Sequence, residues 1–389
     1  MRASRGRKST IYDIGIAAEA SPTTVSLVLS GSWRRYRIKQ ETATRILDCA
    51  ERLGYAVNLK ARGLRLSRSG LAGLIVPHYR NRFFAGLAEA FEATARAQGL
   101  CPIVASTHRH PDNERKVTET LLSHQVEFLF VAGVHNPDPL NELCRVAGVR
   151  CVNVDLPGSK APSVVSDNRG GARKLTEVII KKLASQGLDA SELFFLGGEA
   201  ADDATRNRLL GFRDAIAAHG IALRDNAIEC CGYPPSYAAR SLAAKFAERG
   251  RLPSGMFLNG VTALEGALRF TSMLPPSSLE RVAVGSFDWD PFAVHLPFDL
   301  TMVRQNVEVL ISEAFALLDN HDNAGPNPLV IVPTSFGKMG ERESTEEDWT
   351  ATALSIPRGA QRRSEGPLSS KTPTHLRRIR SKLARAKSI

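Results

Sequence analysis

From Gly70 onward, short apolar runs alternate with amphipathic stretches, and this alternation limits the possible folds more than any other feature of the chain. The apolar runs have the length and the β-branched and aromatic content of buried strands. The stretches between them, such as "GLAEAFEATARAQG", "NERKVTETLLSHQ" and "LGFRDAIAAHG", repeat apolar residues at helical spacing. The predicted strands are "LAGLIVP", "CPIVAS", "VEFLFVAGV", "RCVNVD", "SVVSD", "ELFFLGG", "GMFLNG", "RVAVGSFD", "LTMVRQ" and "LVIVPTSF".

Strands that alternate with helices predict an α/β fold with a parallel, doubly wound sheet, which binds ligands at the carboxyl ends of its strands. The alternation spans about 270 residues, so we expect two such lobes within residues 70–343. We place the N-lobe at about 70–171 and 302–330, and the C-lobe at about 172–301 and 331–343. "SDNRGGA" is expected to start a helix that Asp167 caps.

The first part of the chain, residues 9–56, has an all-α pattern of three short helices. Ser21 followed by Pro22 is a strong start signal for the second helix, whose apolar face is Val25, Val28 and Leu29. In the third helix, "KQETATRILDCAERLGY", we expect the buried set to be Ala43, Ile46, Leu47, Ala50 and Leu53. Three short helices with a tight turn predict a helix-turn-helix.

Positive charge is concentrated at both ends of the chain. Residues 1–70 hold fourteen Lys and Arg against five Asp and Glu, and residues 357–389 hold ten against one. The middle of the chain is acidic, with a net charge of −7. A basic head on an acidic body indicates a module that binds a polyanion. The alternative is a solvated basic segment at each end, or a generic three-helix bundle with a basic loop.

We interpret the second helix as a recognition helix that enters the DNA major groove. Hydroxyl side chains on it can reach a phosphate or a base edge, and Leu27 can contact a thymine methyl group. The arginines after it can neutralise phosphates. The candidate DNA-binding residues of this region are Thr10, Tyr12, Ser21, Pro22, Thr23, Thr24, Ser26, Leu27, Arg34, Arg35, Tyr36 and Arg37.

At these residues the chain resembles the LacI/GalR family of bacterial transcriptional repressors. "TIYDIGIAAEASPTTVSLVLSG" is similar to the family's opening helix-turn-helix, and "LGYAVNLKARGLR" to the segment that leads into its hinge helix. "GLIVP" with "NRFF", "NVDLPGSKAPSVVSDNRGGA", "RNRLLGF", "VAVGSFD" and "LTMVRQ" resemble later landmarks of the family. "SWRRYRIKQET", "NLKARGLRLSRS" and "HPDNE" further resemble the fructose repressor (catabolite repressor/activator) branch.

The resemblance implies a hinge helix or linker over residues 57–69, which folds on the operator. Leu64 stands where the family has a leucine that wedges into the minor groove, with Ala61 at the facing small site. An apolar wedge of this kind unstacks a base step and bends the duplex. Asn58 is a further candidate contact at the start of the hinge. Without the resemblance, Leu64 could equally be a linker or core leucine.

The chain also departs from the family pattern. Glu19 stands at the usual turn glycine, Gly15 at a common packed alanine, and Val57 at the proline before the hinge. A glutamate held at positive φ costs roughly 1–2 kcal/mol. These departures put the docking geometry of the helix-turn-helix in question, although not its presence.

The resemblance implies a periplasmic-binding-protein-like type I domain that closes on a small molecule. Arg208, Asp288 and Asn259 match the family's cleft arginine, aspartate and asparagine, and Asp155 matches the acidic residue after its fourth strand. Carboxylates accept hydrogen bonds from the hydroxyl groups of polyols, and a guanidinium donates to their oxygens. The alternative for these residues is surface ion pairing.

His78, Arg80, Asn81 and Phe84 follow the first predicted strand, where family ligands meet the N-lobe. A histidine and an arginine suit an anionic ligand. We therefore expect a sugar or sugar-phosphate effector, such as a fructose phosphate.

Other functional classes lack their signatures. The sequence has no Walker loop, GxGxxG, GxSxG or HExxH motif, so we expect neither an enzyme nor a cofactor. "HRH" at 108–110 has no carboxylate or cysteine partner at ligand spacing, so we interpret it as a surface loop and expect no metal site. The Pro/Ser/Arg-rich residues 344–389 are expected to be a disordered basic tail.

The six cysteines are scattered and form no CxxC pair, which favours a reducing cytoplasm. We interpret vicinal Cys230 and Cys231 as a strand end. Apolar runs long enough to span a membrane, or to form the core of a secretory signal, are absent from the sequence. These observations predict a cytoplasmic protein without a membrane partner.

Together these patterns predict a transcriptional regulator, most plainly a repressor, that binds a palindromic operator on double-stranded DNA as a homodimer or homotetramer. A small ligand would change operator affinity through its differential affinity for two arrangements of the lobes. The rival hypothesis is a cytoplasmic sugar-binding or sugar-modifying protein whose basic head binds nucleic acid non-specifically.

Overall fold

The computed structural model describes residues 9–55, 68–319 and 327–337. The first described part is a head of three α-helices and one short 3-10 turn. These are α1 (Ile11–Ala17), α2 (Pro22–Leu29), η1 (Ser32–Arg34) and α3 (Gln40–Arg52). The predicted all-α helix-turn-helix is confirmed, and its core contains Ile14, Ala18, Val25, Val28, Ala43, Ile46, Cys49 and Ala50.

Two members of the expected core of α3 are not buried. Leu47 is 48% exposed and Leu53 is 37% exposed. Cys49, which lay outside the expected set, is 2% exposed and takes the inward place instead. Leu53 is the C-cap residue, so it lies beyond the last turn that packs on the other helices. The predicted start of α2 is confirmed, because the Ser21 side chain accepts a hydrogen bond from the backbone N–H of Thr24 at 3.1 Å.

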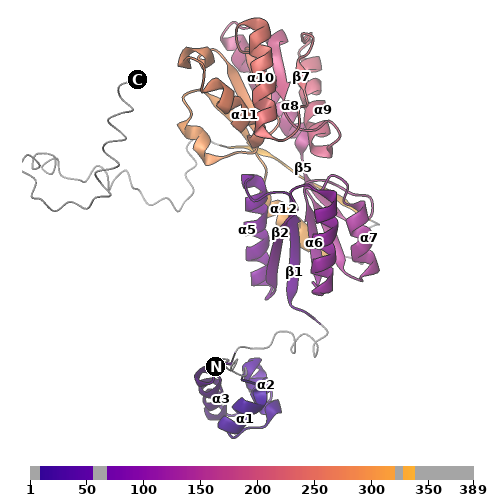
Figure 1. Cartoon of the computed structure of the whole chain (residues 1–389), viewed down its shortest axis with the longest axis vertical. Coiled ribbons are helices and arrows are strands. Elements are labelled where there is room, and N and C mark those ends of the chain that lie inside the picture. Colours follow the sequence, from indigo (N-terminus) through magenta and orange to yellow (C-terminus); the bar gives the residue numbers. More distant parts are fainter. Residues whose placement is uncertain (1–8, 56–67, 320–326, 338–389) are drawn as a thin grey trace, which may run out of the picture. The chain divides into compact units, whose positions relative to one another are not determined.

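The N-lobe is a six-stranded parallel sheet in the order β11-β5-β4-β3-β1-β2. Helices α5 and α12 pack in the apolar core on one face, and α6 and α7 in the core on the other (Figure 1). The strands are β1 (Leu71–Val76), β2 (Cys101–Ser106), β3 (Phe128–Ala132), β4 (Arg150–Val154), β5 (Ser163–Ser166) and β11 (Leu329–Val332). The helices are α5 (Arg82–Ala97), α6 (Pro111–Ser123), α7 (Asp138–Val146) and α12 (Val307–Asp319).

The C-lobe repeats this architecture in the order β12-β10-β9-β8-β6-β7, with only β12 antiparallel among its described strands. Helices α8 and α9 cover one face, and α10 and α11 the other. The strands are β6 (Leu193–Leu196), β7 (Ile228–Glu229), β8 (Gly255–Leu258), β9 (Ala283–Phe287), β10 (Leu300–Arg304) and β12 (Ser335–Phe336). The helices are α8 (Asn168–Ser185), α9 (Asp203–Ala218), α10 (Pro235–Arg249) and α11 (Val261–Thr271), and short 3-10 turns are η2 (Ala190–Glu192), η3 (Pro276–Leu279) and η4 (Pro291–His295).

The predicted fold of two doubly wound lobes is confirmed, and each predicted strand segment contains a strand. Asp167 caps α8 as expected, because it accepts from the N–H of Gly170 at 2.8 Å. Strand β7 was not among the predicted apolar runs, although it ends directly before Cys230 and Cys231, which were interpreted as a strand end. "LVIVPTSF" forms two strands, β11 and β12, that belong to different sheets.

Within the described residues, the chain crosses between the sheets three times: from β5 to α8, from β10 to α12, and from β11 to β12. The expected lobe limits at 301/302 and 330/331 cut through β10 and β11, and the expected limit at 171/172 lies inside α8. A strand's apolar pattern shows that it is buried but not which sheet it joins. The exact crossings therefore could not be located from the pattern.

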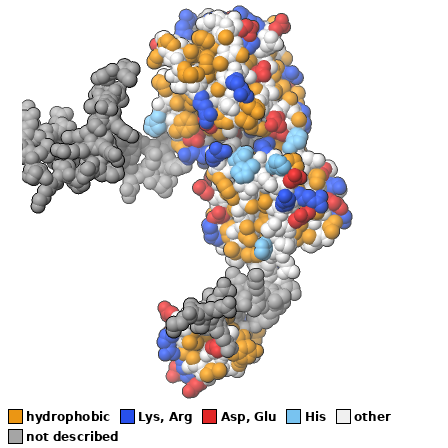
Figure 2. Space-filling view, in the orientation of Figure 1, with side chains coloured by type: hydrophobic (Ala, Val, Ile, Leu, Met, Phe, Trp, Pro, Cys, Tyr) orange, Lys and Arg blue, Asp and Glu red, His pale blue; other side chains and the backbone are white. Residues whose placement is uncertain are grey.

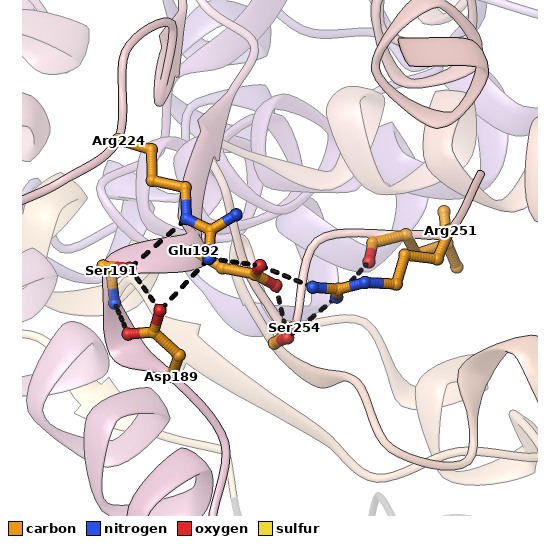
Figure 3. Close-up of polar contacts among 7 residues, drawn as sticks. Asp189, Ser191, Glu192, Arg224, Arg251 and Ser254 are labelled. Carbon is orange, nitrogen blue, oxygen red and sulfur yellow. Dashed lines mark hydrogen bonds and ion pairs between the residues drawn. The ribbon is translucent and has the colours of Figure 1, made fainter. Parts of the chain in front are cut away.

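An ion-pair network around one buried carboxylate connects the loops at the amino end of β6 in the C-lobe. The carboxylate of Glu192 is 1% exposed and lies 2.9 Å from the guanidinium of Arg224. Arg251 and Ser254 also donate to it, Ser254 at 2.7 Å. Figure 3 shows the two arginines approaching Glu192 from opposite sides. Burial alone would raise the pKa of Glu192, but the hydrogen bonds from Arg251 and Ser254 outweigh it and the pKa is lowered.

We predict that Glu192→Gln lowers the free energy of unfolding at pH 7 by about 1–3 kcal/mol, because two arginines lose a buried charged acceptor. The pKa in the folded state lies below the unfolded value of 4.5. The contribution is therefore complete above pH 4.5 and is lost as the pH falls through the lowered folded pKa. Urea unfolding of both proteins from pH 7 down to pH 3.5 should show their curves converging.

Glu177→Gln is the matched control, because Glu177 forms only a partly exposed i,i+4 pair with Arg173. We expect it to change stability by no more than about 0.5 kcal/mol at any pH. A gap between Glu192→Gln and the wild type that stays constant across the pH series would contradict the role of the charge.

Candidate effector site and DNA-binding head

Polar side chains from both lobes follow the carboxyl ends of the parallel strands. Asp155 follows β4 and Asp288 follows β9, and both lie in the left-handed backbone region, with φ of 75° and 64°. Non-glycine residues pay roughly 1–2 kcal/mol for this conformation, and they persist at sites where the surrounding structure holds them. Asn259 and Gln305 directly follow β8 and β10. With Arg208 of α9, these residues form what we call the strand-end cluster.

Arg208 is the best-held member of this cluster. It is 5% exposed, and its Nε donates to Oδ1 of Asn168 at 2.8 Å. Its Nη1 donates to the carbonyl of Asn259, and its Nη2 lies 3.8 Å from Oδ1 of Asp288. The guanidinium stacks on the ring of Phe287 at 4.0 Å. The structure thus brings together Arg208, Asn259 and Asp288, which the sequence analysis had placed in one site.

Asp155 lies near the same charged groups, but within the described residues its carboxyl group forms no close ion pair. Burial is the largest cause that raises its pKa, to about 7, and nearby Asp288 and Asp202 add to the shift. Arg208 and Arg109 act in the opposite direction. Near neutral pH this carboxyl group therefore exists in both protonation states, and it can either accept or donate a hydrogen bond.

Four buried polar atoms at the carboxyl ends of strands have no hydrogen-bond partner within the described residues. They are Oγ1 of Thr107, Oγ of Ser166, Oδ1 of Asn259 and Oε1 of Gln305. A fifth such atom, Oγ1 of Thr118, lies on α6. Buried polar groups are almost always paired in folded proteins. Their gathering at one edge of the sheets fits a ligand rich in hydroxyl groups.

Cationic groups gather on the N-lobe side of this edge. Nδ1 of His78 lies 3.3 Å from Nδ1 of His108. The pKa of His78 is lowered, first by burial and then by the positive charges of His108, Arg109 and Arg80. Lys, Arg and His side chains also gather on the surface where the two lobes meet (Figure 2). Two histidines and two arginines thus lie close enough together on this side of the strand ends to affect one another's charge.

The other two N-lobe candidates have structural contacts. The side chain of Asn81 caps α5 by accepting from the N–H of Phe83 at 3.0 Å. Phe84 is 4% exposed within the N-lobe core, where its ring meets that of Phe83 edge-on. Their contacts in this structure are thus with the scaffold of the lobe.

Several residues of this region were missed by the sequence analysis. Arg109, His135 and Tyr233 surround the carboxylate of Asp202, which is fully buried. Gln305 donates from Nε2 to Oδ1 of Asp288 at 2.6 Å. "HRH" does form a loop, with His108 and Arg109 at φ of 57° and 54°. Its place directly after a predicted strand was the signal that could have identified Arg109.

In the head, every described residue expected to bind DNA lies at the surface or is partly exposed. Tyr12, Ser21, Thr23, Arg34, Arg35, Tyr36 and Arg37 are exposed, and Thr10, Pro22, Thr24, Ser26 and Leu27 are partly exposed. Thr10 and Asp13 form a capping box at the start of α1. Ser21 and Thr24 contact each other through their hydroxyl oxygens at 2.8 Å. Asn58, Ala61 and Leu64 lie outside the described residues.

The turn between α1 and α2 explains two departures from the family pattern. Glu19 has a φ of 46°, so the expected positive φ is confirmed. At Gly15, a Cβ atom would lie only 2.9 Å from the carbonyl oxygen of Ala20. The turn thus approaches α1 so closely at Gly15 that a side chain there would have little space. The left-handed position of the turn is occupied by Glu19.

Within the described residues, no helix is long and apolar enough to cross a membrane. The same part of the chain holds no group of three or more His, Cys, Asp or Glu side chains arranged to bind a metal ion. All six cysteines are free thiols.

Two family descriptions match this chain. Residues 10–58 match the bacterial regulatory proteins of the lacI family, and residues 69–267 match the periplasmic binding proteins and sugar binding domain of the LacI family. The chain belongs to the LacI family. The resemblance found in the sequence is thereby confirmed for both the head and the two lobes.

Among LacI-family relatives, the ribitol operon repressor of Klebsiella aerogenes is 40% identical over 56% of this chain and 81% of the relative. The sucrose operon repressor of Klebsiella pneumoniae is 32% identical over 83% of this chain and 95% of the relative. The fructose operon regulatory protein of Vibrio cholerae is 25% identical over 80% of this chain and 93% of the relative.

Two solved structures have the same fold. The lac repressor dimer bound to operator and the anti-inducer ONPF has a TM-score of 0.71 at 18% identity, covering 85% of this chain and 98% of that one. The Cra regulator of Pseudomonas putida in complex with fructose 1-phosphate has a TM-score of 0.61 at 21% identity, covering 69% and 98%.

We predict that Glu19→Gly stabilises the head by about 1 kcal/mol, because glycine adopts positive φ without a steric penalty. In the full-length protein, amide hydrogen exchange of residues 10–55 should become slower. Glu41→Gly, in the first turn of α3, is the control of opposite sign, and it should speed exchange. Faster exchange in Glu19→Gly would contradict the strain at this turn.

Proposed function

We propose that this LacI-family protein is a sequence-specific DNA-binding repressor of an operon of carbohydrate metabolism, whose operator affinity is set by a sugar or sugar-phosphate effector. The single observation that carries the effector proposal is the set of unpartnered buried polar atoms at the strand ends, one of which belongs to Asn259, a contact of Arg208. A polyol supplies the hydroxyl groups that these atoms lack. The names of the ribitol, sucrose and fructose operon relatives support the same class of pathway.

In this proposal, the strand-end cluster binds the hydroxyl groups of the effector. Arg208 donates to its oxygens, while Asp155, Asn259 and Asp288 accept from its hydroxyl groups. His78 and Arg80 face an anionic group, as a phosphorylated sugar would present. Asn81 and Phe84 would contribute indirectly, by positioning the first turn of α5. The Cra neighbour, which holds fructose 1-phosphate, supports this choice of ligand class.

The head would contact the operator through α2 and the basic turn after it. Thr23, Thr24, Ser26 and Leu27 would face base edges, while Thr10, Tyr12, Ser21, Pro22 and Tyr36 would contact the backbone with Arg34, Arg35 and Arg37. Asn58, Ala61 and Leu64 remain proposed hinge contacts. A homodimer in the cytoplasm matches a palindromic operator, as the operator-bound lac repressor dimer illustrates. Regulation, and not catalysis, is the activity proposed.

Footprinting of the full-length protein on genomic fragments tests the DNA-binding part of this proposal. We expect protection of a palindrome near a carbohydrate operon, and its loss or gain when the cognate sugar or sugar phosphate is added. Uniform binding to all fragments that weakens with salt would instead support a sugar-binding protein with a non-specific basic head. Binding of neutral sugars alone, in calorimetry with a panel of both kinds, would exclude the phosphorylated effector.

We predict that Arg208→Ala leaves operator affinity within about threefold of the wild type but weakens effector binding by a hundredfold or more, since a buried charged donor to the ligand is lost. Arg206→Ala is the matched control, because Arg206 lies two positions earlier on α9 but its side chain is 55% exposed and pairs with Asp203. It should respond to effector normally. A fully responsive Arg208→Ala protein would remove Arg208 from the site.

A further inference from the structure

Asp202 is a buried carboxylate at the start of α9 that does not cap this helix through its side chain. It is the N-cap residue of α9, but its side chain accepts no hydrogen bond from the backbone of that helix. Aspartate at an N-cap usually accepts such a bond from the second or third helical N–H. Asp202 is 0% exposed, so its carboxylate needs other donors.

Those donors come from both lobes. In the N-lobe, Nδ1 of His135 lies 2.6 Å from Oδ1, and Nη1 of Arg109 lies 3.4 Å from Oδ2. In the C-lobe, the hydroxyl group of Tyr233 donates to Oδ2. The guanidinium of Arg109 also stacks over the ring of Tyr233 at 4.2 Å. We call these four residues the Asp202 bridge.

The Asp202 bridge has the chemistry of an anion site. A guanidinium, an imidazole and a phenol converge on two oxygens that carry one negative charge, as protein donors do around a bound phosphate or carboxylate. The anion they hold is part of the chain itself. The bridge also adjoins the strand-end cluster, because Asp202 and Arg109 both act on the pKa of Asp155.

We propose that Asp202 is a built-in counter-anion that joins the two lobes and determines effector specificity. By occupying Arg109 and His135, it excludes an anionic group from this end of the effector site. A phosphate or carboxylate on an effector is thereby directed to His78, Arg80 and His108, while hydroxyl groups meet the strand-end cluster. This inference rests on the proposed function, because it concerns the same effector site.

The test is sulfate binding by full-length Asp202→Asn, measured by calorimetry at pH 7 with ionic strength held constant. The variant keeps the volume of the side chain but releases the donors of Arg109 and His135. We expect it to bind sulfate at least about tenfold more tightly than the wild type does. Adding Arg109→Gln to Asp202→Asn should abolish this gain in sulfate affinity. If Asp202 were only structural, the gain would not depend on Arg109.

Asp203→Asn is the matched control. It removes the same charge one residue further along, where the carboxylate accepts from Asn207 at 2.9 Å and pairs with Arg206. We expect no gain in sulfate affinity. An equal gain in Asp203→Asn would show a general charge effect, and no gain in a folded Asp202→Asn would equally overturn the proposal.

If Asp202→Asn fails to fold, Arg109→Gln alone decides the matter. This variant keeps the buried carboxylate and removes the N-lobe cation. Amide exchange at residues 199–205 of the C-lobe should then become faster, although the substitution lies in the other lobe. Unchanged exchange there would overturn the bridge. Both tests use neither operator nor sugar, so their failure would leave the proposed regulatory function intact. That function is tested separately, by footprinting of the wild-type protein on operator DNA.

Discussion

The whole site depends on one constraint: strands that run parallel end at the same edge of their sheet. Each crossover helix returns the chain to the opposite edge, so residues that follow successive strands meet in space although they lie far apart in sequence. Asp155, Asn259 and Asp288 each follow a different strand. Their convergence on Arg208 is therefore a consequence of topology, and the chemistry of the site is a matter of which side chain each strand ends with.

Because the chain crosses between the two sheets, the strand ends of both lobes lie at the site. Both lobes contribute polar groups to it, and ion pairs connect the lobes: Arg109 to Asp202 in one place, and Arg82 to Asp290 at 2.9 Å in another. A ligand that contacts both lobes acts on the same equilibrium as these pairs. Because a ligand shifts an equilibrium only by its differential affinity for the two states, the strength of the built-in pairs sets how much the effector must contribute.

The sequence was sufficient for most elements of the fold and, through the family resemblance, for placing Arg208, Asn259 and Asp288 in one site. Apolar periodicity located β1 to β6 and the helices between them, and the resemblance to the LacI/GalR family identified Asp288 and Asn259. It did not show that β11 and β12 separate into two sheets, because burial is the same in either. Nor did it show the pairing of Arg109 with Asp202, since those residues lie in loops of different lobes and no sequence pattern links one to the other.

The three carboxyl groups of the site differ in whether a guanidinium lies close to them. Asp288 is beside Arg208, and Asp202 beside Arg109, so each of these carboxylates has a guanidinium at close range. Asp155 has no such partner among the described residues, and burial raises its pKa to about 7. A hydroxyl group that donates to Asp155 favours its charged form, because hydrogen bonds to a carboxylate stabilise the ionised state. If the proposed polyol binds here, its binding would be coupled to proton release at Asp155, and an uncharged ligand would change the charge of the site.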